Sequence, residues 1–191
     1  SVSMQLGRKN ITETFALCGW DVSLNELKWI AQWQFVNGVT SLCPHLEGYS
    51  LRGLRKRDYP ASLFTHLPWF DEAYKAFADY FTGLGAMLDS GYEEPQLLVM
   101  HMMQSVYPLY NPLDKSGIIR KLELSFNNTV NKLANLHIPH HYGDDTVIKH
   151  NGSVEENMLR IGKCLYNAVL LPELININEE TAELLLKFAK A

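Results

Sequence analysis

Two stretches of the sequence decide the fold. They are Glu13-Thr-Phe-Ala-Leu-Cys-Gly-Trp20 and Pro44-His-Leu-Glu-Gly-Tyr-Ser-Leu-Arg-Gly-Leu-Arg-Lys-Arg-Asp-Tyr-Pro60. Each stretch comes at the end of a short apolar run, over residues 11–17 and 38–43, that favours a strand. Between the runs, Ser23 and Glu26 form a capping-box pair, and apolar residues recur at helical spacing over residues 24–37. The predicted order is therefore strand, helix, strand and long loop.

This order predicts that Glu13 and His45 lie close together. A crossover helix joins two parallel strands, and the carboxyl ends of parallel strands lie at one edge of a sheet. In barrels and open α/β sheets the catalytic groups sit at that edge. The stretch is therefore interpreted as part of an active site in which Glu13 and His45 face one cleft. A surface loop with ordinary charges is the alternative.

The order of short motifs in this region resembles that of a known enzyme type. The motifs are Thr12-Glu-Thr-Phe15, Gly19-Trp-Asp21, Leu27-Lys-Trp-Ile-Ala-Gln-Trp-Gln34, Pro44-His-Leu46, Tyr49-Ser-Leu-Arg-Gly53 and Pro68-Trp69. They resemble the last two βα units of a bacterial glycoside hydrolase barrel of the family 106 α-L-rhamnosidase-like type. From Leu97 onward the chain is similar to the glutamine-amidotransferase-like, flavodoxin-type domain that follows the barrel in such enzymes and in family 42 β-galactosidases.

The resemblance implies an α/β fold class with two truncated parts. Residues 1–92 would be the last βα units of a TIM barrel, and residues 93–191 a small doubly wound, flavodoxin-like domain with a parallel sheet. The expected boundary is Glu93-Glu-Pro95, a polar segment that contains proline. The implied activity is cleavage of a terminal rhamnoside or galactoside. A non-catalytic carbohydrate-binding or oligomerisation module is the alternative.

Glycosidic cleavage needs two carboxylates, about 5–5.5 Å apart for retention of configuration and roughly 6.5–9.5 Å apart for inversion. By resemblance, Glu13 matches the strand-seven glutamate of the barrel, a nucleophile in some relatives and a general acid in others. The alternative for Glu13 is a cap or an ion pair with Arg52 or Arg55. Glu47 is the other acid of the motif, and it either binds a sugar hydroxyl or has no role. The second carboxylate is expected on an earlier barrel strand, outside this chain.

Aromatic and basic residues of the same region suit a sugar-binding site, because aromatic rings stack on pyranose faces while His and Arg donate hydrogen bonds to hydroxyls. The predicted substrate-binding residues are Trp20, His45, Glu47, Tyr49, Arg52 and Trp69. A buried structural histidine is the alternative for His45. Trp29 and Trp33 are expected in the core of their helix.

Composition limits the partners of the chain. Its 191 residues carry a formal net charge of −4. Residues 1–93 hold 8 basic and 10 acidic side chains and residues 94–191 hold 9 and 11, so each half is mildly acidic. This balance argues against nucleic acid and anionic membranes as partners. The expected partners are a carbohydrate substrate, the missing N-terminal barrel of the parent chain and, as an open alternative, a second copy in a homo-oligomer.

Nothing in the sequence predicts a metal, a cofactor or a membrane span. The three cysteines lack metal-type spacing and are expected to be buried free thiols. His140 and His141 are adjacent, so their side chains should point apart in a strand. Cys164 does not lie in a strand-to-helix elbow, and the second half is therefore expected to be catalytically silent. A cytoplasmic protein is expected, unless the chain is an excised fragment whose targeting signal lies elsewhere.

Local patterns predict the remaining elements of the second half. Buried strands are expected over 97–103, 138–142 and 168–171, and a β-ribbon over 159–165 that turns at Gly162-Lys163. The helices are expected over 116–136 and 179–190, and Asp144 or Asp145 should cap a short helix between them. Strands that alternate with helices indicate the doubly wound pattern.

Overall fold

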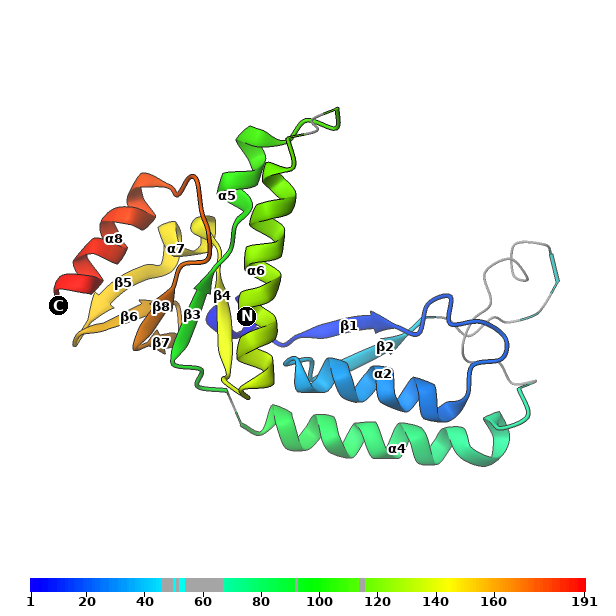
Figure 1. Ribbon diagram of the computed structural model, residues 1–191. Helices are drawn as coiled ribbons and strands as arrows, with labels where there is room; N and C mark the ends of the chain where they lie inside the picture. The colour runs from blue at the N-terminus through cyan, green and yellow to red at the C-terminus, as the bar shows by residue number, and fades with distance from the viewer. Residues whose placement is uncertain (46–49, 51, 54–66, 92, 114–115) are drawn as a thin grey trace. The chain divides into compact units, whose positions relative to one another are not determined.

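The computed structural model describes residues 1–45, 50, 52–53, 67–91, 93–113 and 116–191 (Figure 1). The chain is a mixed α/β protein with small parallel and antiparallel sheets, as the coarse fold prediction stated. It divides into two compact units. Residues 9–92 are called the N-terminal unit here, and residues 1–8 together with 93–191 are called the C-terminal unit.

The N-terminal unit contains one parallel strand pair. β1 (Ile11–Thr14) and β2 (Ser41–Pro44) pair with Glu13 opposite Cys43, and α2 (Leu24–Val36) joins them. The predicted strand, helix, strand order is therefore confirmed. α4 (Phe70–Asp89) follows and packs against α2, where the rings of Phe35 and Phe81 lie 5.5 Å apart.

The amino end of α2 is fixed by the predicted capping box. The hydroxyl oxygen of Ser23 accepts a hydrogen bond from the Glu26 amide, and the Glu26 carboxylate accepts one from the Ser23 amide at 2.7 Å. These two bonds satisfy backbone donors that a helix otherwise leaves open at its start.

The expectation that Trp29 and Trp33 lie in the helix core is wrong. The buried face of α2 consists of Leu27, Ala31 and Phe35, which recur every fourth residue. Trp29 and Trp33 have the same spacing but lie on another face, and they are 69% and 61% exposed. Cys43 is also exposed, against the expectation of a buried thiol, although all three cysteines are free.

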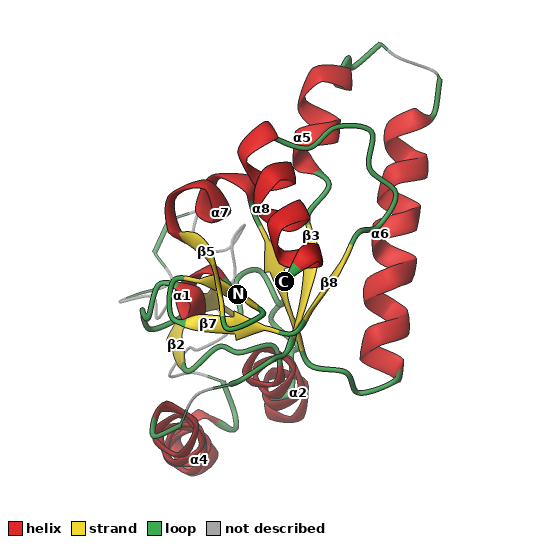
Figure 2. Ribbon diagram, turned by 90° about the vertical axis from the view of Figure 1, so that its left-hand side faces the viewer, coloured by secondary structure: helices red, strands yellow, loops and turns green. Residues whose placement is uncertain are grey.

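A three-stranded parallel sheet organises the C-terminal unit. β3 (Leu97–Met100) lies between β4 (His140–Gly143) and β8 (Ala168–Leu170), and α6 (Ile118–Asn135) connects β3 to β4. Around the sheet lie α1 (Val2–Gln5), α5 (Met103–Val106), η1 (Tyr107–Leu109), α7 (Asp145–Asn151) and α8 (Glu179–Lys190) (Figure 2). The strand predicted over 97–103 is shorter than expected, because α5 begins at Met103.

The expected β-ribbon is present and has one strand more than predicted. β6 (Met158–Ile161) and β7 (Cys164–Tyr166) are antiparallel and turn at 162–163, where Gly162 has φ +56°. β5 (Gly152–Glu155) pairs with the other edge of β6. The two sheets share a core in which Leu98, Met100 and Leu159 are fully buried.

Residues 1–8 belong to the C-terminal unit, not to the N-terminal part where the sequence analysis placed them. Gln5 is fully buried, and its side-chain amide donates to the Tyr166 hydroxyl at 2.9 Å. Its carbonyl accepts from the amide of Lys163, so α1 lies against β7 and its turn (Figure 2). The boundary between Tyr92 and Glu93 lies at the position that was predicted.

Candidate active site

The parallel pairing of β1 and β2 brings Glu13 and His45 together. The amide of His45 donates to the Thr14 carbonyl at 2.7 Å and so extends the pairing by one residue beyond β2. Side chains alternate along a strand, and Thr14 is buried while Glu13 points to solvent. The geometry predicted from the crossover helix is therefore confirmed for these two residues.

A short polar contact joins the two side chains. His45 Nε2 lies 3.3 Å from Glu13 Oε1, and the side chains are 31% and 65% exposed. His45 Nδ1 is buried and has no hydrogen-bond partner among the residues that the structure describes. The imidazole thus contacts one carboxylate oxygen of Glu13.

The backbone directly after Glu13 is strained. Phe15 and Leu17 have φ values of +69° and +56°, which side chains other than glycine rarely adopt. Such a residue costs on the order of 1–3 kcal/mol and persists only where packing holds it. Phe15 is buried, and its ring lies 6.0 Å from that of Phe77. This packing fixes the strand end that carries the carboxylate.

Trp20, Arg52 and Trp69 are not part of the contact between Glu13 and His45. Trp20 is 37% exposed in the bend after Gly19, and Arg52 is exposed, with its amide donating to Ser50 Oγ. Trp69 packs against the core cluster of the unit, beside Phe70. Glu47 and Tyr49, like Arg55, lie outside the described residues.

The structure offers no metal site in the part of the chain that it describes, since no three His, Cys, Asp or Glu side chains are grouped to hold an ion. His140 and His141 point apart: His140 Nδ1 lies 3.0 Å from the Ile138 carbonyl, whereas His141 is buried. Over the same described residues, no helix is long and apolar enough to cross a bilayer.

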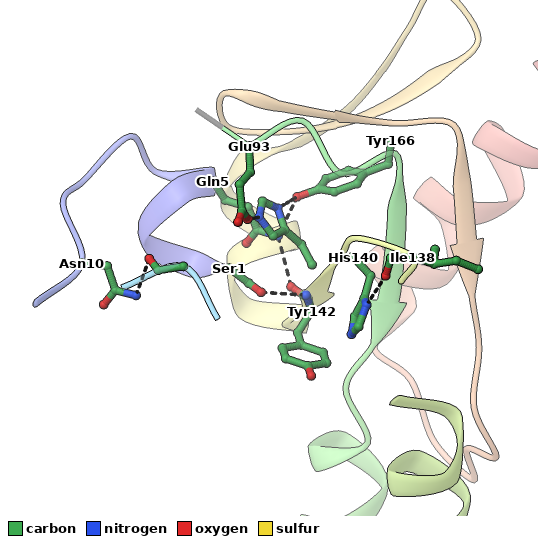
Figure 3. A network of polar contacts seen from close by, with 10 residues as sticks. Ser1, Gln5, Asn10, Glu93, Ile138, His140, Tyr142 and Tyr166 are labelled. Atoms are coloured by element: carbon green, nitrogen blue, oxygen red, sulfur yellow. Dashed lines mark hydrogen bonds and ion pairs between the residues drawn. The ribbon is translucent and has the colours of Figure 1, made fainter. Parts of the chain in front are cut away.

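A buried polar network in the C-terminal unit was not predicted (Figure 3). The Tyr166 hydroxyl contacts both Gln5 Nε2 and His141 Nδ1, at 2.9 and 2.8 Å. On its other side, His141 Nε2 lies 3.9 Å from a carboxylate oxygen of Glu93. Burial lowers the pKa of His141 to about 4 and raises the pKa of Tyr166. Both side chains are therefore neutral near pH 7, which suits a packed network and not a proton-transfer site.

No protein-family model matches the chain, and no curated protein matches it significantly.

Proposed function

We propose that the chain is part of a glycoside hydrolase and that Glu13 is one of its two catalytic carboxylates. The observation that supports this role is the contact of 3.3 Å between Glu13 and His45 at the carboxyl ends of two parallel strands. Parallel α/β folds keep their catalytic groups at this edge. The resemblance of the surrounding motifs to a barrel glycosidase then gives the reaction class, cleavage of a terminal rhamnoside or galactoside.

His45 would act as a positioning residue for the carboxylate. The contact of 3.3 Å between its Nε2 and Oε1 would fix the orientation of the Glu13 side chain. An ionised carboxylate is what a retaining enzyme needs as its nucleophile. In an inverting enzyme the same side chain would be protonated, and this carboxylic acid would act as the general acid that donates its proton to the leaving-group oxygen.

The proposal requires strands beyond this chain. A closed barrel has eight βα units, and the described residues supply β1 with α2 and β2 with α4. The N-terminal barrel of the parent would contribute the second carboxylate and the remaining wall of the sugar site. Glu47 is the acid within this chain that could take that role instead. A cytoplasmic location completes the proposal.

The C-terminal unit fits a catalytically silent, flavodoxin-like domain. Its sheet order places β3 between β4 and β8, and in such sheets ligands bind beyond the carboxyl ends of the strands, where the order reverses. Here hydrogen bonds connect the segments that follow β3 and β8. Ser105, in the helix after β3, accepts hydrogen bonds from the amides of Ile175 and Asn176 in the loop after β8, each at 2.9 Å. These bonds join the loop after β8 to the helix after β3.

The decisive experiment is Glu13→Gln in the full-length parent enzyme. We expect turnover of an aryl rhamnoside or galactoside to fall by several orders of magnitude with sugar binding retained, because the amide cannot act as a nucleophile or acid. His45→Ala should lower turnover less. Glu72→Gln, a change at an exposed position on α4, is the matched control and should leave turnover unchanged.

The alternative is a non-catalytic carbohydrate-binding or assembly module, and one observation favours it. Trp29 and Trp33 expose their rings on one face of α2, and such faces stack on sugars. Unchanged turnover in Glu13→Gln, with sugar binding or subunit assembly lost in Trp29→Ala and Trp33→Ala, would establish this second function and exclude the first.

A further inference from the structure

The short helix α1 covers the outer edge of β4 in the C-terminal unit. β4 is an edge strand of the three-stranded sheet, and it pairs with β3 on one side only. Along a strand the backbone groups of successive residues alternate in direction. The Gly143 carbonyl accepts from the amide of His101, which follows β3, so the groups of Tyr142 point away from β3. Without α1, the amide and the carbonyl of Tyr142 would form an open edge.

Two side chains at the beginning of the chain satisfy both of these groups. The Tyr142 amide donates to Ser1 Oγ at 3.0 Å, and the Tyr142 carbonyl accepts from Gln5 Nε2 at 3.1 Å (Figure 3). Gln5 is held in turn by the Tyr166 hydroxyl and by the Lys163 amide, which donates to the Gln5 carbonyl at 2.8 Å. A helix of four residues has little stability of its own, so these contacts keep α1 in place.

The strand itself carries none of the usual protections of an edge. Edge strands are commonly protected by charged side chains, by proline, by a bulge or by a covering segment. β4 reads His140-His-Tyr-Gly143, without Lys, Arg, Asp, Glu or proline, and its register with β3 is regular. Pro139 precedes the strand, and by the alternation its nitrogen faces the β3 side. Protection of the outer edge therefore depends on α1.

We propose that residues 1–8 form a releasable strap, and that its release lets β4 pair antiparallel with β4 of a second copy of this chain. A two-fold axis at Tyr142 makes the edge self-complementary, because each Tyr142 amide donates to the Tyr142 carbonyl of the other copy. These two bonds replace the two that the strap supplies. The same register places His140 opposite Asp144 of the second copy, where the Asp144 backbone is still extended, with φ −99° and ψ 130°. A histidine opposite a carboxylate adds a favourable cross-strand pair.

The test is to displace the strap and measure self-association of the full chain by sedimentation over a series of concentrations. A Cβ at Gly162 would lie 2.2 Å from the Gln5 carbonyl oxygen, so Gly162→Ala should displace the strap without changing it. We expect the dissociation constant of the dimer to fall by about tenfold or more, since about 1.4 kcal/mol is tenfold and a hydrogen bond contributes about 1 kcal/mol. Gly117→Ala is the matched control, because Gly117 also has a left-handed φ, +73°, but open space around its Cβ position.

A second pair of variants displaces the strap from its own side. Gln5→Ala removes the donor to the Tyr142 carbonyl and should also promote association by about tenfold or more. Val2→Ala changes an exposed residue of the same helix and should associate no more than the wild type.

A third pair identifies the surface that associates. In the Gly162→Ala chain, Tyr142→Pro removes the outward amide and should restore the monomer, whereas Tyr142→Ala loses the same ring, retains the amide and should still associate. Amide exchange of β3 checks that the unit stays folded. Strap variants that associate no more than their controls, equal association by the two Tyr142 variants, or association only with loss of β3 protection would each overturn the inference. The strap and β4 belong to the C-terminal unit, so this proposal can fail while Glu13 is catalytic, and the reverse.

Discussion

The two units differ in how completely their parallel strands are covered. In the C-terminal unit β3 has a strand on each side, and Leu98, Val99 and Met100 have no exposed surface. In the N-terminal unit β1 and β2 have only each other among the described residues, and Ile11 is 64% exposed. Parallel sheets are normally buried on both faces, and two strands alone are marginally stable.

The difference shows which unit has the more complete sheet. The C-terminal unit buries its central strand, and Ser105 joins the helix after β3 to the loop after β8. The N-terminal unit carries the candidate carboxylate, an open strand edge and the exposed rings of Trp29 and Trp33. The proposed catalytic carboxylate thus lies in the unit whose strands are less covered.

The largest expected effect is loss of the buried hydroxyl in the complete unit. Tyr166→Phe leaves His141 Nδ1 without its partner inside the core, whereas Gln5 Nε2 keeps its hydrogen bond to the Tyr142 carbonyl. An unsatisfied buried polar group costs about 1–3 kcal/mol, so the free energy of unfolding of the C-terminal unit should fall by about 1–3 kcal/mol. Amide hydrogen exchange of β3 at increasing urea concentrations measures this loss.

Tyr80→Phe is the matched control in the other unit. The Tyr80 hydroxyl accepts from Gln32 at 2.9 Å, but both side chains are at the surface, and the change should stay within about 0.5 kcal/mol. All four tryptophans lie in the N-terminal unit, so their fluorescence follows its unfolding. An equal shift of the tryptophan transition in Tyr166→Phe would show that the two units unfold together. The difference in strand coverage would then not give the units separate stabilities.

Acid should weaken the C-terminal unit through His141. Its pKa is about 4 in the folded chain, because of burial, and 6.5 in an ordinary environment. As the pH falls, the unfolded chain therefore binds a proton first. The stabilisation from a neutral His141 is present above about pH 6.5 and is lost towards pH 4, which amounts to about 2 kcal/mol from about pH 7 to about pH 5.

The measurement is the slope of unfolding free energy against pH, again from β3 exchange. His141→Asn should flatten this slope although it lowers stability at every pH. His137→Asn removes an exposed histidine at a left-handed position that asparagine tolerates, so it should leave the slope unchanged. A wild-type slope equal to that of His141→Asn would exclude the buried, neutral histidine.

Elements with local signals were predictable from sequence. The capping box of α2, the Asp144 cap of α7 and the helix over 179–190 all depend on residues a few positions apart. The turn at Gly162 is another such case. Contacts between residues far apart in the sequence were not predicted. Gln5 forms a hydrogen bond with Tyr166, 161 positions away, and no local pattern indicates that pair. Trp29 and Trp33 were also misplaced, because they have the same helical spacing as the residues that α2 buries.

The candidate site was predictable to the extent that topology fixes it. The parallel pairing alone places Glu13 next to His45, because both follow strand ends at one edge. Trp69, in contrast, is partly buried and packs against the core cluster of its unit. Aromatic residues serve both cores and sugar sites, so residue type cannot separate the two roles.

The smallest expected effect is the change in stability when alanine replaces either of two glycines of α4. Gly85 lies where α4 approaches β2, and an added Cβ would lie 2.8 Å from the Thr40 carbonyl oxygen. Gly83, two residues earlier, has open space around it. Alanine stabilises a helix interior by roughly 0.5–1 kcal/mol relative to glycine, so Gly83→Ala should raise the midpoint of the tryptophan-detected urea transition.

Gly85→Ala should instead lower this midpoint. The same helical gain is outweighed by about 1–3 kcal/mol for displacing backbone in a packed contact, so the net loss is about 1–2 kcal/mol. The two variants are chemically identical, and the difference between them isolates the steric term between α4 and β2. Equal shifts would mean that the helix does not approach Thr40 closely.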